Sequence, residues 1–67
     1  MVLITELNGR SYYLNFKLIE QVIPDEGGTI LKLTSSNTIR VKNSPEDVVQ
    51  QIKDYERYIH QQIEVIG

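Results

Sequence analysis

Short β-prone runs, separated by turn residues, make up the first two thirds of the chain, and apolar and polar residues alternate in the last two of these runs. Residues 3–7 and 10–15 are rich in Leu, Ile, Thr and Tyr, and Asn8 and Gly9 lie between the two runs. An Asn-Gly pair between β-prone runs predicts a hairpin with a type I′ turn, because both residues tolerate a positive φ. We therefore interpret Asn8 and Gly9 as structural turn residues.

A two-residue turn at this position sets the register of the predicted hairpin. Leu3 then faces Leu14, and Ile4 faces Tyr13 on the other side. Neither side is purely polar, so we expect protein to cover one side fully and the other in part. In so short a chain this pattern predicts a curled sheet or a partner.

A second β-prone segment follows after a predicted tight turn. Asn15 is a natural cap for that turn, and residues 18–23 have the composition of a short strand. Pro24 is expected to end this strand, and residues 25–28 are expected to form a loop.

Two further strands are predicted over residues 29–34 and 38–42. A loop with an odd number of residues keeps the apolar side chains of both strands on one side of the sheet. We place the centre of this loop at Asn37 in the left-handed conformation, which puts Leu33 opposite Val41.

The period then changes to that of a helix over residues 44–64. Ser44 is the expected N-cap and Pro45 the first helical residue, and Asp47 stands at the capping-box position. Apolar residues follow at spacings of three and four, which predicts an amphipathic helix. This stripe consists of Val48, Ile52, Tyr55, Ile59 and Ile63.

These elements predict the fold class. We expect one α+β domain over residues 1–67, with a β-rich part over residues 1–43 and the helix after it. The β-rich part is expected to be a small curled antiparallel meander of four or five short strands.

Composition excludes several ways of stabilising so small a domain. The 67 residues include no Cys and one His, which excludes disulfides and the usual structural zinc sites. Domains of this size bury little apolar surface, so we expect self-association. The net charge of −2 and the lack of a dense basic stripe argue against non-specific binding to nucleic acid.

The sequence shows no pattern typical of a membrane span or a signal peptide. No apolar run approaches the roughly 18 residues of a membrane span, and the first ten residues do not resemble a signal peptide. We expect a cytoplasmic protein.

Few residues in the sequence are candidates for a catalytic site. Glu46 and Asp47 are paired carboxylates, but their place at a helix start explains them. His60 lacks the partners that a catalytic base or metal ligand needs. We predict no enzyme activity, and no catalytic, cofactor, metal or small-molecule substrate site.

Two groups of residues are candidates for protein contacts. Aromatic residues gather near Arg10 and Lys17, which is also the composition of a platform for single-stranded nucleic acid, although burial in the core is the simpler interpretation. The later part of the apolar helix stripe either covers the sheet or packs against another subunit. The candidates are Tyr12, Tyr13 and Phe16 in the first group and Ile59, Ile63 and Ile66 in the second.

The order of these signals resembles a known family. The run Ile4–Gly9 (ITELNG), followed by Leu14-Asn15 and Leu18–Glu20, and the later SPEDVV at residues 44–49 are similar to the flagellar FlbD family, also called SwrD. The resemblance extends over nearly the whole chain.

This resemblance implies a cytoplasmic accessory protein of bacterial flagellar motility, at the cytoplasmic face of the motor. The expected partner is a flagellar motor or stator protein, and the family implies no known enzymatic activity or cofactor. The alternative that we retain from the residues is a small nucleic-acid-binding module that uses the curled sheet.

Overall fold

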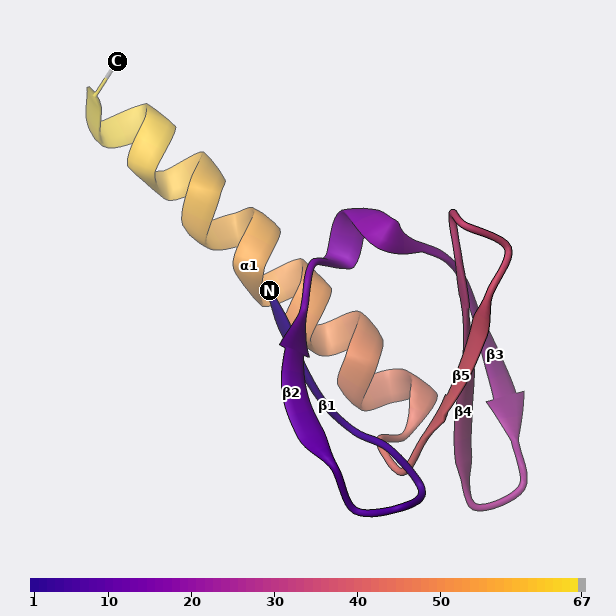
Figure 1. The fold of residues 1–67 in the computed structure, drawn as a ribbon. Helices are drawn as coiled ribbons and strands as arrows, with labels where there is room; N and C mark the ends of the chain where they lie inside the picture. Colours follow the sequence, from indigo (N-terminus) through magenta and orange to yellow (C-terminus); the bar gives the residue numbers. More distant parts are fainter. Residues whose placement is uncertain (67) are drawn as a thin grey trace.

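The fold is α+β, as predicted. The structure is a computed structural model that describes the backbone of residues 1–66 and the side chains of residues 1–58. Short antiparallel strands precede one long helix (Figure 1). The elements are β1 (Val2–Thr5), β2 (Ser11–Leu14), the 3₁₀ helix η1 (Phe16–Leu18), β3 (Ile19–Asp25), β4 (Gly28–Leu33), β5 (Thr38–Val41) and α1 (Pro45–Ile66).

The strands form two small sheets that are joined at one corner. β1 pairs with β2, and β3, β4 and β5 follow in that order in the second sheet. A bridge between Glu6 and Val41 connects the sheets just beyond the end of β1, and the Lys42 N–H donates to the Thr5 carbonyl at 2.7 Å. The result is a curled meander, with α1 running past both sheets (Figure 1).

The first hairpin exists, but its predicted register is wrong by one residue. Leu3 lies opposite Tyr13, and Ile4 lies opposite Tyr12. A shift of one residue exchanges the two sides of a strand. As a result Ile4 is buried, whereas Leu3 and Tyr13 are on the exposed side.

A longer turn explains the difference. The Gly9 N–H donates to the Glu6 carbonyl at 2.9 Å and the Glu6 N–H donates to the Arg10 carbonyl at 2.8 Å, which encloses three residues instead of two. Gly9 has φ of 94°, whereas Asn8 has no positive φ. Asn8 instead accepts the Arg10 N–H with its side-chain oxygen at 2.9 Å. This is a type I turn with a glycine bulge, and the predicted type I′ turn is wrong.

The loop between β4 and β5 is of the same kind. It has the predicted odd length, but its centre lies two residues earlier. The Leu33 N–H donates to the Asn37 carbonyl at 2.8 Å, and Ser36, with φ of 75°, is left-handed in place of Asn37. Val41 therefore pairs with Thr29 and not with Leu33.

Pro24 does not end β3. It lies within the strand and pairs with Thr29. Because β3 is at an edge of its sheet, its outer side needs no ladder partner, and a proline is compatible with that position. Only Glu26 and Gly27 remain between β3 and β4.

The start of α1 follows the prediction, with one addition. The Ser44 hydroxyl oxygen accepts the Asp47 N–H at 3.1 Å, so Ser44 is the N-cap. The Asp47 carboxylate accepts the side-chain amides of Asn43 and Gln51, at 2.8 and 3.0 Å. Asp47 thus orients two amide side chains that lie against β1.

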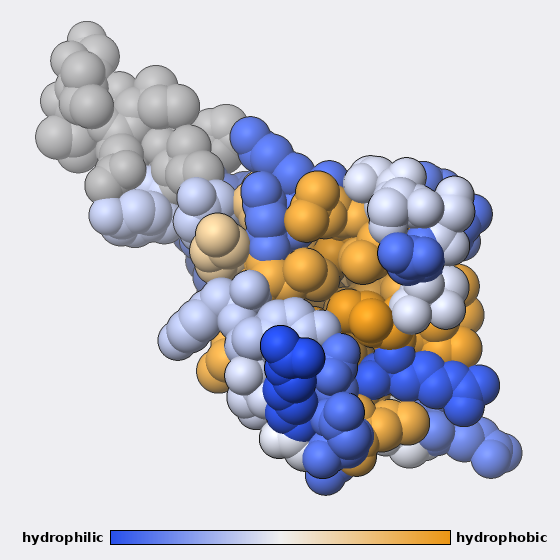
Figure 2. Space-filling view, viewed as in Figure 1, coloured by the Kyte–Doolittle hydropathy of each residue, from blue (hydrophilic) through white to orange (hydrophobic). Residues whose placement is uncertain are grey.

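The core lies where the two sheets and the first half of α1 meet. Figure 2 shows apolar side chains gathered between the β1–β2 hairpin and the three-stranded sheet. The fully buried apolar residues come from β1, β4, β5 and α1, and they are Val2, Ile4, Leu31, Val41 and Val48.

Candidate functional site: surfaces for protein contact

The two adjacent tyrosines of β2 lie on opposite sides of the hairpin. Tyr12 is on the inner side and packs against the core. Tyr13 is on the outer side and is 70% exposed, next to Leu3, which is 42% exposed. Tyr13 and Leu3 form an apolar pair on the outside of the domain. The role of Tyr13 in protein contact stays a prediction.

Tyr12 is held by neighbours of opposite charge. Its hydroxyl donates to the Glu6 carboxylate at 2.7 Å, and the Arg10 guanidinium lies 5.3 Å from the centre of its ring. Burial raises the pKa of Tyr12, and the hydrogen bond to Glu6 and its charge raise this pKa further, while Arg10 lowers it. The neutral phenol is therefore favoured, and the three side chains stabilise the hairpin.

Phe16 connects η1 to the helix. Its ring meets that of Tyr55 edge to face, with 5.2 Å between the ring centres. A small pocket of about 170 Å³ lies beside this contact and is lined by Met1, Asn15 and Lys17 in addition to the two rings. The Phe16 side chain thus packs against α1 within the molecule.

The three aromatic candidates therefore do not form one platform. Tyr12 faces the core, Tyr13 faces outward and Phe16 packs on α1. Stacking of successive bases needs rings that share one surface. This arrangement does not favour the alternative of a nucleic-acid-binding sheet.

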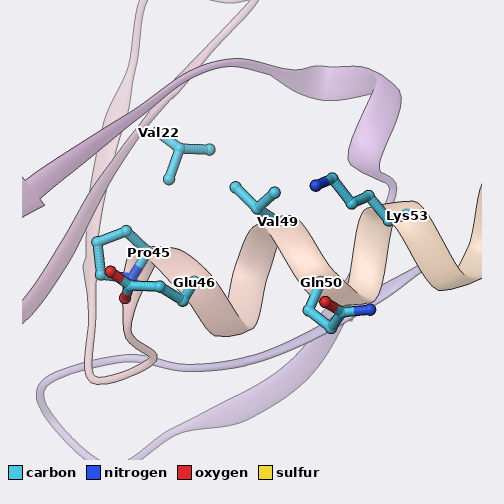
Figure 3. Close-up of a pocket in the computed structure, with 6 residues that line it drawn as sticks. All are labelled: Val22, Pro45, Glu46, Val49, Gln50 and Lys53. Atoms are coloured by element: carbon cyan, nitrogen blue, oxygen red, sulfur yellow. The ribbon is translucent and has the colours of Figure 1, made fainter.

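A groove between β3 and α1 was not predicted from the sequence. Figure 3 shows Val22 of β3 and Val49 of α1 pointing toward one another across it. The groove has a volume of about 420 Å³, and Val49 is 39% exposed. Glu46 and Lys53 lie toward its two ends (Figure 3). The sequence contains one indication of this groove. Val49 is an apolar residue directly beside the helix stripe that covers the sheet.

The remaining predicted residues are the turn and cap residues and the later residues of the helix. Asn8, Gly9 and Ser44 have structural roles in a turn and a cap, and Asn37 closes a loop. The side chains of Ile59, Ile63, Ile66 and His60 lie outside the part of the chain that the structure describes.

The described residues contain neither a metal-binding cluster nor a membrane-spanning helix. No group of His, Asp or Glu side chains there is arranged to hold a metal ion. No helix in this part of the chain has the length and apolar character of a membrane span. The exposed apolar side chains and the groove are the surface features of this part of the chain that are suited to binding.

Comparison with known protein families gives a match over most of the chain. A family model, FlbD, described as flagellar and swarming motility proteins, matches residues 1–60. These residues include all five strands and the part of α1 that packs on them. Neither the curated proteins nor the solved structures contain a significant match.

Proposed function

Because the chain belongs to the FlbD family of flagellar and swarming motility proteins, we propose that it is a non-enzymatic accessory protein that supports the flagellar motor and its stator units. It acts by binding motor or stator proteins at the cytoplasmic face of the motor. The match over residues 1–60 is the observation that carries this proposal.

The surface of the domain supports action through protein contacts. Apolar side chains are exposed on several elements, including Leu3 and Tyr13 on the hairpin and Val49 in the groove. Such groups are typical of binding surfaces. Among the described residues, Tyr12 is the titratable group with a shifted pKa, and its hydrogen bond to Glu6 serves stability.

The proposal predicts a defect in motor output with intact flagella. Deleting the gene in a motile host is expected to lower swimming speed and the torque of tethered cells, while filament number stays the same. Expression of the wild-type chain is expected to restore both. Leu31→Asp, which places a charge in the core, serves as the unfolded control and is expected not to restore them.

A binding experiment tests the partner class. The tagged wild-type chain is expected to be cross-linked to motor or stator proteins in motile cells, and Leu31→Asp is expected not to be. Normal torque in the deletion strain would contradict the motor role. Lowered torque without cross-linking to any motor or stator protein would contradict direct contact.

A further inference from the structure

The outer edge of β1 is covered by Gln51 of α1 and by Lys42 and Asn43, which precede the helix. The Gln51 amide accepts the Leu3 N–H and donates to the Leu3 carbonyl, both at 2.9 Å. The Asn43 side-chain oxygen accepts the Thr5 N–H at 2.8 Å, and the Lys42 N–H donates to the Thr5 carbonyl. These amides complete the hydrogen bonds that a neighbouring strand would otherwise supply.

Two other edges are protected in different ways. The end of β5 pairs with Glu6 and Leu7 through the bridge at Val41. β3 contains Pro24, carries the charges of Glu20 and Asp25, and has an irregular register near its start. Prolines, charges and irregular pairing are the usual means by which proteins prevent strands from pairing at a sheet edge.

The edge of β2 has none of these protections. The main chain of Leu3 bonds to Gln51, so Leu3 and Tyr13 are a non-hydrogen-bonded pair and the main-chain groups of Tyr13 point away from β1. The same reasoning applies to Ser11, which faces Thr5. Within the described residues, no segment bonds to these outward groups. Between Ser11 and Leu14 there is no charge and no proline.

We propose that the β2 edge pairs with β2 of a second copy of this chain, antiparallel and around a two-fold axis at Tyr12. In this register Ser11 of each copy faces Tyr13 of the other, and the outward N–H and C=O groups of both residues all find partners. This inference is independent of the proposed motor role.

The side chains of β2 favour a second copy in this register. Each exposed Tyr13 ring faces the small Ser11 side chain of the other copy, so large and small residues are matched across the new pair. The two Arg10 side chains lie at opposite ends of the paired strands, which avoids repulsion between like charges. A register shifted by one residue on each strand would oppose the two Tyr13 rings and lose this match.

A pairing of two four-residue strands is a small interface. It lies below the area of about 1,200 Å² that stable complexes usually bury. The dimer is therefore weak, and its population rises with protein concentration.

Tyr13→Pro tests the pairing. It removes the outward N–H and leaves the hydrogen bonds between β1 and β2 in place, as Pro24 does in β3. We expect this change to raise the dimer dissociation constant, measured by sedimentation equilibrium, by at least about tenfold. Thr38→Pro is the matched control, because Thr38 is exposed and its N–H also points outward, from β5. We expect this control to dimerise like the wild type.

Amide hydrogen exchange of the wild-type chain provides an independent measurement. The amides of Ser11 and Tyr13 are expected to exchange more slowly as the concentration rises from micromolar to millimolar, while those of Tyr12 and Leu14 are slow throughout. This measurement decides the question if Tyr13→Pro fails to fold by circular dichroism. A monomeric wild type at millimolar concentration would overturn the proposal. A folded Tyr13→Pro that dimerises normally, or a dimer with unchanged exchange at Ser11 and Tyr13, would also overturn it.

Discussion

Gly9 and Ser36 occupy equivalent positions in two loops of the same design. In each loop a positive φ, 94° at Gly9 and 75° at Ser36, brings the chain back into the next strand. Glycine adopts this conformation freely, whereas a residue with a Cβ is strained. The β1–β2 loop therefore has the residue that favours a positive φ, Gly9, whereas the β4–β5 loop has Ser36, which does not favour it.

Substitution of Gly9 is expected to be destabilising. Gly9→Val places a β-branched side chain at a positive φ and is expected to lower the free energy of unfolding by more than about 1 kcal/mol. Urea denaturation measures this change. A variant that melts like the wild type but fails to support motility would show that Gly9 is a binding residue.

Replacing Ser36 in the β4–β5 loop by glycine is expected to have the opposite effect on stability. Ser36→Gly relieves strain at the same backbone position, so we expect it to raise the free energy of unfolding by about 0.5 to 1 kcal/mol. A loss of stability would show that the Ser36 side chain has a role that outweighs its strain.

Tyr12 is expected to make the stability of the domain depend on pH in the alkaline range. Its pKa in the folded protein is raised above the ordinary value of about 10. A raised pKa stabilises the folded state below the unfolded pKa, and this contribution is lost as pH rises through the folded pKa. We expect the wild type to lose more stability than Tyr12→Phe between pH 7 and about 11.

The same variant tests the hydrogen bond to Glu6 at neutral pH. Tyr12→Phe is expected to cost about 1 kcal/mol in urea denaturation, because the Glu6 carboxylate loses its donor. Parallel alkaline curves for the two proteins would show that Tyr12 is not the group responsible for the pH dependence.

Residue roles were predicted well where they depend on local sequence. Ser44 caps α1, and Asn15 accepts the Lys17 N–H at 3.0 Å, as expected of a cap. Asn37 was wrongly assigned the left-handed position. Pairing between the strands determines which loop residue takes a positive φ, and here that residue is Ser36, although Asn adopts the conformation more readily.

At the scale of elements, the contact between α1 and β1 is central. Gln51 bonds to Leu3, and Asn43 also donates to the Leu3 carbonyl, at 3.1 Å. Asp47 holds both amides in place. Two elements far apart in the sequence are thereby joined through side-chain amides that act like a strand.

Gln51→Ala tests this contact. It leaves the Leu3 N–H without an acceptor, while Asn43 still donates to the Leu3 carbonyl, and it is expected to lower the free energy of unfolding by about 1 to 2 kcal/mol. Gln50→Ala is the matched control, because Gln50 bonds only to Asp54 on the exposed side of the helix, and it is expected to change stability by less than about 0.5 kcal/mol. Equal effects in urea denaturation would reject a special role for Gln51.

The elements themselves were largely predictable, but their register was not. β-prone composition, turn residues and the change of period were sufficient to predict four or five strands and a helix. The register of the first hairpin failed because apolar residues occur on both sides of each strand, so the pattern fits a two-residue turn as well as a three-residue one. The groove and the exposed β2 edge could not be predicted, because both depend on how elements from different parts of the chain meet.

At the scale of the whole molecule, α1 is longer than the sheets that it covers. Its 22 residues span about 33 Å, and Figure 1 shows the helix continuing beyond the strands. The sequence places Ile59, Ile63 and Ile66 in this part of the helix. Their role in association with another protein stays a prediction.

The double change Ile63→Asp with Ile66→Asp tests this role. If these residues contact the motor partner, motility falls while the melting temperature and the β2 dimer are retained. Each isoleucine that is fully buried in an interface contributes about 1.5 to 3 kcal/mol. Motility assays, light scattering and thermal melting measure the three properties. Retained motility with a lowered melting temperature would show that these residues belong to the core.

The bond between Gln51 and Leu3 also affects how the chain folds during synthesis. β1 leaves the ribosome long before Gln51 does, so its outer edge has no partner while β2 to β5 are being made. Contacts between residues 48 positions apart form late, after the intervening chain has closed into a loop. The first hairpin therefore completes its hydrogen bonds only when the helix docks, so we expect the edge of β1 to become protected together with the helix.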